Sequence, residues 1–319
     1  MSIGMWAPAF RLLSPGKRRA KLPIFIFHRV LARPDSLLYG EPDAFQFDWM
    51  VRFISRNFRV LPFGQAVMLL QEGRLPAAAA CITFDDGYRD NHAVALPILQ
   101  RHGVAATFFI ATGFLDGGRM WNDDVIEAIR ALPNGVVDWS KHGLGSLDLT
   151  TLAERRAALD STLRKLKYLP HAHRAEIARA LAKEAGVGDR SELMMSPDEV
   201  RSLRAAGMEI GGHTRSHPIL KNLDDADAYA EISEGKREVE AILGGSIRVF
   251  AYPNGNPQLD LGPSHVEMLR EIGFAAAATT EQAIAATDTD PLLMPRFTPW
   301  DRTPLRFGAR CALALAGRT

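Results

Sequence analysis

Two segments of this sequence have the side chains and the spacing needed for metal-assisted hydrolysis. The segment TFDDG, at residues 83–87, follows an apolar run, and two carboxylates at the end of a strand suit one metal ligand and one general base. The segment GGHTRSHP, at residues 211–218, holds two histidines four residues apart, and neutral imidazoles suit zinc and other late transition metals. Because proline disfavours helical geometry in the residue before it, we expect His217 and its partner His213 to lie in a loop.

Each of these segments also has a simpler explanation. Asp-Gly is common in turns, and a chain with nine histidines contains a pair at this spacing by chance in roughly a quarter of cases. Three weaker candidates are FAYPNG at residues 250–255, His28 after the apolar run 23–27, and Arg296 at the end of the run 292–297. Taken singly, an ordinary turn, a packed histidine and a surface charge explain them equally well.

The elements that must position these residues alternate between strands and helices. Apolar runs predict about seven strands, near residues 23–27, 78–84, 105–111, 208–211, 247–252, 274–278 and 292–297, with a further short strand near residues 58–61. Helical patterns lie near residues 47–55, 64–72, 91–102, 229–243 and 265–272, and another helix begins near residue 197. This alternation predicts an α/β fold with a parallel sheet and outer helices. The candidate residues fall at the carboxyl ends of strands, which is the edge that holds the active site in parallel barrels.

The chain is expected to form one barrel domain with two additions. Residues 115–196 are rich in Ala, Leu, Arg, Lys and Glu at helical spacing, which predicts a mostly helical insertion. Residues 1–20 are expected to form an N-terminal tail, so that the barrel domain spans residues 21–310.

Composition excludes some classes of protein. A net charge of +1 argues against nucleic acid as the main partner, because phosphate binding needs a basic surface. No apolar run reaches the roughly 18 residues of a membrane span. The first residues make a poor secretory signal, since their charges follow the apolar stretch. We therefore expect a cytoplasmic protein or one peripheral to a membrane; its oligomeric state is not indicated.

The segments TFDDG, HTRSHP and FAYPNG, in this order, resemble the motifs of the polysaccharide deacetylases of carbohydrate esterase family 4. The resemblance covers about residues 22–112 and 197–300 and leaves out the insertion. It implies a distorted (β/α)7 barrel. It also implies the removal of N-acetyl groups from an amino-sugar oligo- or polysaccharide, such as a chitooligosaccharide or the exopolysaccharide poly-N-acetylglucosamine.

The resemblance also implies roles for individual residues. Asp85 matches the general base of the family, and Asp86, His213 and His217 match its metal-binding triad, for which we expect a divalent ion, zinc in the first place. His28 resembles the N-terminal histidine of the circularly permuted members, which is expected to protonate the departing amine.

Two positions depart from the family pattern. Ala251 stands where many members have the arginine of FRxPYG, and Asn254 stands where they have tyrosine. Arg296 is therefore our candidate for orienting the base, because it leaves another strand at the same edge. A backbone N–H near Asn254, with Tyr252 beside it, is expected to stabilise the oxyanion.

Trp121 is our candidate for the floor beneath a sugar chain, unless the insertion is only structural and distant from the site. Other functions remain open on this fold. These are hydrolysis of an O-acetyl ester or of a small cyclic amide, and an inert module that only binds polysaccharide.

Overall fold

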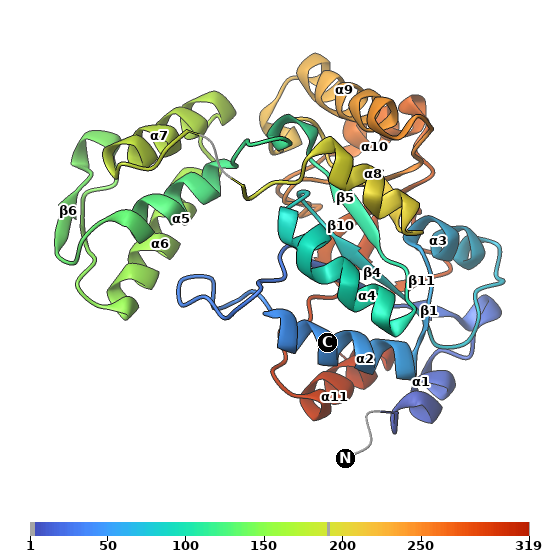
Figure 1. The fold of residues 1–319 in the computed structure, drawn as a ribbon. Helices are drawn as coiled ribbons and strands as arrows, with labels where there is room; N and C mark the ends of the chain where they lie inside the picture. Colours follow the sequence, from blue (N-terminus) through green and yellow to red (C-terminus); the bar gives the residue numbers. More distant parts are fainter. Residues whose placement is uncertain (1–3, 190–191, 319) are drawn as a thin grey trace.

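The computed structural model describes residues 4–189 and 192–318, and its centre is a parallel sheet that curls into a barrel (Figure 1). Seven strands lie side by side, and all pairings between them are parallel. In spatial order they are β12 (Met294–Arg296), β10 (Ala276–Gln282), β9 (Val249–Ala251), β8 (Glu209–Gly212), β5 (Thr107–Ile110), β4 (Ala79–Phe84) and β2 (Ile24–Phe27). A short strand, β3 (Arg59–Val60), pairs with β4 outside this path.

The two outer strands of this series meet and nearly close the barrel. The backbone N–H of Phe297 donates to the carbonyl of Ile24 at 2.7 Å, and the N–H of Ile26 donates to the carbonyl of Phe297 at 3.2 Å. These bonds form a parallel bridge between Phe25 and Phe297 just beyond the end of β12. The predicted (β/α)7 barrel is therefore confirmed.

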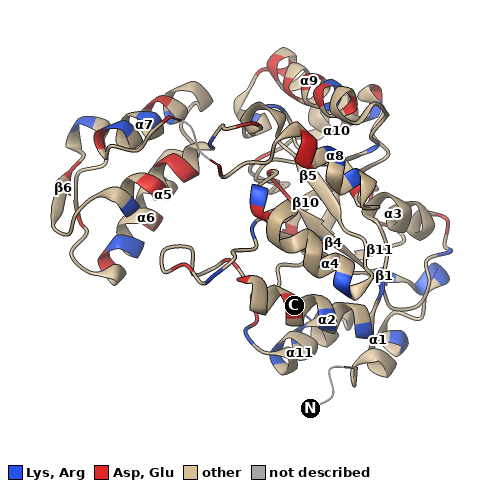
Figure 2. Ribbon diagram, in the orientation of Figure 1, with Lys and Arg blue, Asp and Glu red and all other residues tan. Residues whose placement is uncertain are grey.

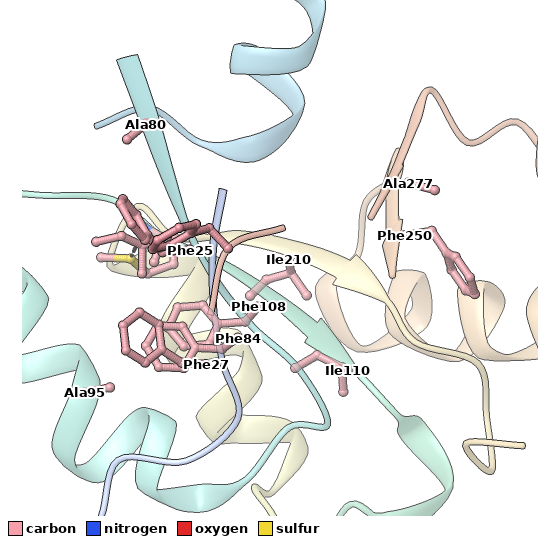
Figure 3. Close-up of a cluster of buried hydrophobic side chains, with 14 of the residues drawn as sticks. Phe25, Phe27, Ala80, Phe84, Ala95, Phe108, Ile110, Ile210, Phe250 and Ala277 are labelled. Carbon is pink, nitrogen blue, oxygen red and sulfur yellow. Dashed lines mark hydrogen bonds between the residues drawn. The ribbon is translucent and has the colours of Figure 1, made fainter. Parts of the chain in front are cut away.

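Alternate residues along each strand face two different cores. Ala79 and Cys81 of β4 lie in an inner cluster to which β9 and β10 also contribute alanines, because the interior of a barrel this narrow has little room. Ile82 and Phe84 face outward into a larger cluster beneath the helices (Figure 3). There the ring of Phe84 stacks on that of Phe108, with centroids 4.7 Å apart. By this alternation the next inward position of β4 after Thr83 is Asp85.

Helices cover the outside of the barrel. They are α2 (Ala44–Asn57), a π-helical turn η2 (Asn91–Ala95) leading into α4 (Leu96–His102), α8 (Pro197–Ala205), α9 (Asp225–Leu243), α10 (Pro263–Ile272) and α11 (Pro304–Leu315). Helix α3 (Phe63–Gln71) instead packs its buried face against the inner cluster. The start of α8 follows the predicted signals: Ser196 and Glu199 form a capping box, and proline occupies the first turn. Within the described ranges, no helix combines the length and the apolar character needed to cross a membrane.

The predicted insertion forms a lobe beside the barrel (Figure 1). Its elements are α5 (Trp121–Ala131), β6 (Val136–Asp138), β7 (Ser146–Asp148), α6 (Leu152–Lys167) and α7 (His171–Glu184). The lobe has a hydrophobic cluster of its own, to which Ile129, Trp139 and Leu181 contribute fully buried side chains. Three helices agree with the predicted helical content, whereas the antiparallel pair β6–β7 was not expected.

The N-terminal segment differs from the expected tail. Helix α1 (Ala7–Leu13) packs on α11 and α2, and Phe10 is fully buried with its ring centroid 4.5 Å from that of Phe58. Pro8 lies in the first turn of this helix, where proline is favourable. After the turn η1 (Lys17–Arg19), β1 (Lys21–Leu22) pairs with β11 (Ala285–Ala286).

Candidate active site

Parallel pairing brings the ends of several strands to one edge of the barrel. Phe27 of β2 lies opposite Phe84 of β4, so the next residues, His28 and Asp85, leave the sheet side by side. In the same way, the end of β8 lies beside that of β5, and His213 follows directly after β8. The candidate residues of the separate motifs therefore meet at the carboxyl edge.

Asp86, His213 and His217 form a cluster that could hold one metal ion. Oδ1 of Asp86 lies 3.3 Å from Nε2 of His213 and 3.4 Å from Nε2 of His217. One donor atom from each of the three side chains lies within 4.8 Å of the others. A carboxylate with two imidazoles is a donor set that zinc accepts, with positions left open for water or substrate.

The hydrogen bonds around the cluster fit a metal ion. Nδ1 of His213 donates to the carbonyl of Ala251 at 2.7 Å, which leaves the lone pair of Nε2 directed at Asp86. Oδ1 of Asp86 and Nδ1 of His217 are buried, and neither has a hydrogen-bond partner among the described residues. An unsatisfied buried carboxylate oxygen is costly without an ion. The residues present therefore fit a divalent metal.

Electrostatics favours the ionised form of Asp86 and the neutral form of His217, which are the forms that bind a metal. Burial would raise the pKa of Asp86, but the close imidazoles of His213 and His217 hold it below its usual value. Burial lowers the pKa of His217 to about 3 and outweighs the opposing charge of Asp86, so its ring is neutral at ordinary pH. Burial also lowers the pKa of His213, but Asp86 and Asp85 together raise it above its usual value.

The loops that present these ligands adopt backbone angles that are unusual for residues other than glycine. The φ angles of Asp86, Thr214, His217 and Asn254 are 77°, 61°, 54° and 60°. Left-handed conformations of this kind cost free energy and tend to cluster at functional sites. Four of the seven such residues found in the described chain lie in the three motifs.

Helix α9 holds the histidine loop in place. A carboxylate oxygen of Glu231 accepts hydrogen bonds from the backbone N–H groups of Arg215 at 3.0 Å and Ser216 at 2.8 Å. Gly235 faces the same loop, and a Cβ there would lie only 2.6 Å from the carbonyl carbon of Thr214. The helix can therefore approach closely only because residue 235 has no side chain.

A buried ion pair lies beside the cluster. The guanidinium of Arg296 binds both carboxylate oxygens of Asp85 at 2.7 Å, and its Nε donates to the carbonyl of Thr279 at 2.7 Å. The side chains are 0% and 2% exposed. Burial alone would raise the pKa of Asp85, but the charge of Arg296 holds it below its usual value. Asp85 is therefore an oriented, ionised carboxylate that can accept a proton.

His28 lies at the solvent side of this pair. Its Nε2 is 4.0 Å from Oδ2 of Asp85, and 45% of its side chain is exposed. The amide of Asn91 donates to the backbone carbonyl of His28 at 2.9 Å and holds the end of β2 in place. The imidazole thus faces the opening above the carboxylate pair.

A cavity of about 310 Å³ covers the whole arrangement. Its floor contains Asp85, Asp86 and the two histidines, and one wall contains His28, Asn254 and Thr280 of the barrel. The opposite wall belongs to the lobe and the segment leading into it: Met120, Trp121, Asn122, Leu163, Arg164 and Lys167. A larger cavity of 540 Å³ lies elsewhere and contains Arg89, whose ion pairs with Glu192 and Glu199 satisfy its charge.

Asn254 and Tyr252 occupy different environments. Asn254 lines the cavity, and its backbone N–H makes no hydrogen bond with another described residue. Tyr252 instead shares the outward orientation of Phe250, whose ring centroid is 5.4 Å from its own, and its backbone N–H is bound to Ala278. The structure therefore does not bring Tyr252 to the cavity, because strand alternation directs its side chain under the helices.

Trp121 lines the cavity at the start of α5, so the lobe is not remote from the candidate site. The guanidinium of Arg174 lies 4.8 Å from the centre of a Trp121 ring and braces it from the side of α7. Sequence reasoning missed Arg164 and Lys167 on the same wall. Their spacing of three on a helical pattern was a signal, but the pattern alone does not show which face of α6 meets the barrel.

Two solved structures share this fold over most of their length. The Streptococcus pyogenes deacetylase PplD superimposes with a TM-score of 0.61 at 16% identity, over 93% of this chain and 98% of that one. IcaB from Ammonifex degensii superimposes with a TM-score of 0.59 at 19% identity, over 93% of this chain and 97% of that one. At such identities the likeness concerns the fold.

Comparison of sequences is more specific about the family than the likeness of fold. The chain is 31% identical over 96 residues to YxkH of Bacillus subtilis. The matched segment makes up 30% of this chain and 33% of that curated relative, so the chain spans about a third of the relative's length. The family model for polysaccharide deacetylases matches residues 72–277, which is more than half of the chain and includes Asp85, Asp86 and both histidines of the cluster. With the barrel and this match together, the chain belongs to the polysaccharide deacetylase family.

Proposed function

We propose that this protein is a metal-dependent hydrolase that removes N-acetyl groups from an amino-sugar oligosaccharide or polysaccharide. One observation carries the proposal: the ionised carboxylate of Asp85, held by buried Arg296, lies beside the cluster of Asp86, His213 and His217 at the floor of one cavity. Membership of the deacetylase family supports a polysaccharide as the substrate class.

Asp86, His213 and His217 are the residues that would hold the ion, and zinc is our first choice because of the two imidazoles. When bound, such an ion supplies Lewis-acid polarisation of the acetyl carbonyl and activation of water. The hydrogen bond from His213 to Ala251 supports this role, since it orients the ring for binding through Nε2.

The remaining roles belong to residues around the cluster. Asp85 takes the proton of the attacking water, and Arg296 keeps its carboxylate oriented without touching the substrate. His28, which faces the opening, gives a proton to the departing amine. The backbone N–H of Asn254, at the wall of the cavity, is our candidate donor to the developing oxyanion. An amine leaves poorly without protonation, so an acid at the position of His28 favours an amide over an ester as the bond that is cut.

The test is hydrolysis by the purified protein loaded with zinc, measured as acetate release from an acetylated substrate and as the gain of one water mass by a cyclic amide. The substrates are an N-acetylglucosamine tetramer, an O-acetylated xylan and a small cyclic amide, each with and without a chelator. We expect acetate from the tetramer, with loss of one acetyl mass per event, and no reaction once the metal is removed. Activity confined to the ester or the cyclic amide would contradict the proposal. Binding of the tetramer without any turnover would identify an inert binding module.

Two weaker predictions concern the partners of the protein and its location in the cell. A net charge of +1 supports a partner other than nucleic acid. Location in the cytoplasm or at a membrane surface stays a prediction, and fractionation of cells that make the full-length protein would test it.

A further inference from the structure

The wall of the cavity that belongs to the lobe presents two positive charges to the candidate site. Arg164 and Lys167 lie three residues apart on α6, and both line the cavity above the cluster (Figure 2 shows basic segments along α6). The side chain of Arg164 is exposed and that of Lys167 is half-buried. Residues three apart on a helix lie on one face, so the two cations point toward the same opening.

Three other basic residues in and beside the lobe are paired with carboxylates. Arg119 is paired with Asp124, Arg130 with Asp35 and Lys141 with Glu184. In contrast, neither Arg164 nor Lys167 forms an ion pair with any carboxylate of the described chain, and the Lys167 ammonium has only the ring of Tyr168, 5.2 Å from its centre.

No carboxylate within the cavity is available to neutralise them. The lining contains two acidic residues, Asp85 and Asp86. Asp85 is fully engaged by Arg296, and Asp86 is enclosed by the two histidines. Together with His28, the walls therefore offer cationic or neutral groups to a ligand that enters, and a ligand with anionic oxygens fits this opening best.

We propose that Arg164 and Lys167 bind an anionic group, a carboxylate or a phosphate, carried by the substrate next to its acetylated sugar. The inference rests on the proposed deacetylation and deepens it, because it makes the substrate an acidic amino-sugar polymer. The guanidinium of Arg164 suits either oxyanion by paired hydrogen bonds, and Lys167 adds a point charge. Trp121, on the same wall, is placed to contact the sugar ring.

The experiment compares three oligosaccharides of similar length with the zinc-loaded full-length protein. One is the neutral N-acetylglucosamine tetramer, one alternates N-acetylglucosamine with glucuronic acid, and one joins N-acetylglucosamine units through phosphodiesters. We expect a higher kcat/KM for at least one acidic substrate, and raised salt should reduce that preference. The two acidic arms distinguish a carboxylate from a phosphate as the group bound.

The variant that tests the site is Arg164→Gln combined with Lys167→Gln, because glutamine keeps helix propensity while removing both charges. Its preference for the acidic substrate over the neutral one should fall about tenfold, because the variant loses two exposed ionic contacts, each of the strength usual at a protein surface. Lys183→Gln is the matched control, since Lys183 is an exposed lysine of the same lobe that does not line the cavity. The control should keep the preference of the wild type.

Calorimetric titration of the metal-free protein with the glucuronate oligosaccharide gives a second readout that does not depend on turnover. Its affinity should be about tenfold lower in the double variant than in the Lys183→Gln control. Equal preference and equal affinity in the double variant and the wild type would overturn the inference, while acetate release from the neutral tetramer would leave the proposed function standing. Absence of acetate release from every substrate, with the charge-dependent affinity intact, would reject the deacetylation instead.

Discussion

The edge of the barrel and the wall of the lobe face each other across one cavity, but they hold their side chains in different ways. At the barrel edge, Asp85 and Arg296 are almost completely buried and bound to each other at 2.7 Å. On the lobe, Trp121 is half-buried, and Arg164 is exposed and has no carboxylate partner among the described residues. Bond-breaking chemistry requires groups fixed within fractions of an ångström, whereas recognition of a polymer tolerates mobile side chains.

This difference leads to an expectation about mutations. Changes at the edge should lower turnover on every acetylated substrate, because all of them share the same bond. Changes on the lobe should alter KM and the choice of substrate. The predictions below test this division.

The largest effect is expected from loss of a metal ligand. His213→Ala removes one of three donors and a ring held by Ala251, so bound zinc and acetate release should both fall below detection. Metal content is measured by elemental mass spectrometry after dialysis. His173→Ala, at an exposed histidine on the lobe, is the control and should retain both. Normal zinc content in the His213 variant would remove this residue from the site.

Asp85→Asn should keep the metal but lower turnover by about 10²–10⁴, near the upper end, because the proton acceptor is lost. Zinc content and kcat are measured on the same folded sample. Loss of zinc with normal folding would show that the roles of Asp85 and Asp86 are reversed.

His28→Ala should lower turnover on an N-acetylated substrate by about 10²–10⁴, the usual contribution of a positioned acid, with metal binding retained. His28 is partly exposed, so the fold should tolerate the change. The same variant should lose less activity on an activated acetyl ester, whose leaving group needs no proton. A near-normal rate on the amide would place the acid elsewhere.

Arg296→Met should lower the free energy of unfolding by about 3–5 kcal/mol, because it leaves the buried carboxylate of Asp85 without a partner. The folded-state pKa of Asp85 is below its usual value, so the wild-type contribution is present above the unfolded pKa and is lost as pH falls through the folded value. Denaturant titrations at neutral and acidic pH should therefore show a variant-to-wild-type difference that shrinks on acidification. A constant difference would mean that the pair contributes through packing alone.

The smallest effect is expected on the lobe. Trp121→Ala should raise KM for an N-acetylglucosamine tetramer about tenfold and change kcat little, because the ring contacts sugar and not the reacting bond. Trp300→Ala, at a tryptophan that is 65% exposed and outside the cavity, is the matched control. A fall in kcat at unchanged KM would contradict the division between the two regions.

Several elements show which structural features local sequence patterns can predict and which they cannot. The strands ending at Phe27 and Phe84 were predictable, since apolar runs of this length report burial in a parallel sheet. Helix α1 was not, because its seven residues are stabilised by burial of Phe10 against Phe58 more than by propensity. The side-chain direction of Tyr252 was also missed, because it depends on the residue at which β9 enters the sheet.

The sequence by itself determined the fold family and singled out the residues at the edge of the barrel. Motifs such as TFDDG are short because one strand end supplies both carboxylates, so their chemistry is visible locally. The sequence made Arg296 a candidate partner of Asp85, 211 positions away, but the contact itself and the position of Arg164 at the same cavity were decided by the tertiary structure. The first depends on closure of the barrel between β2 and β12, and the second on the orientation of α6 in a lobe with its own core. Both follow from packing between distant segments, which no local pattern encodes.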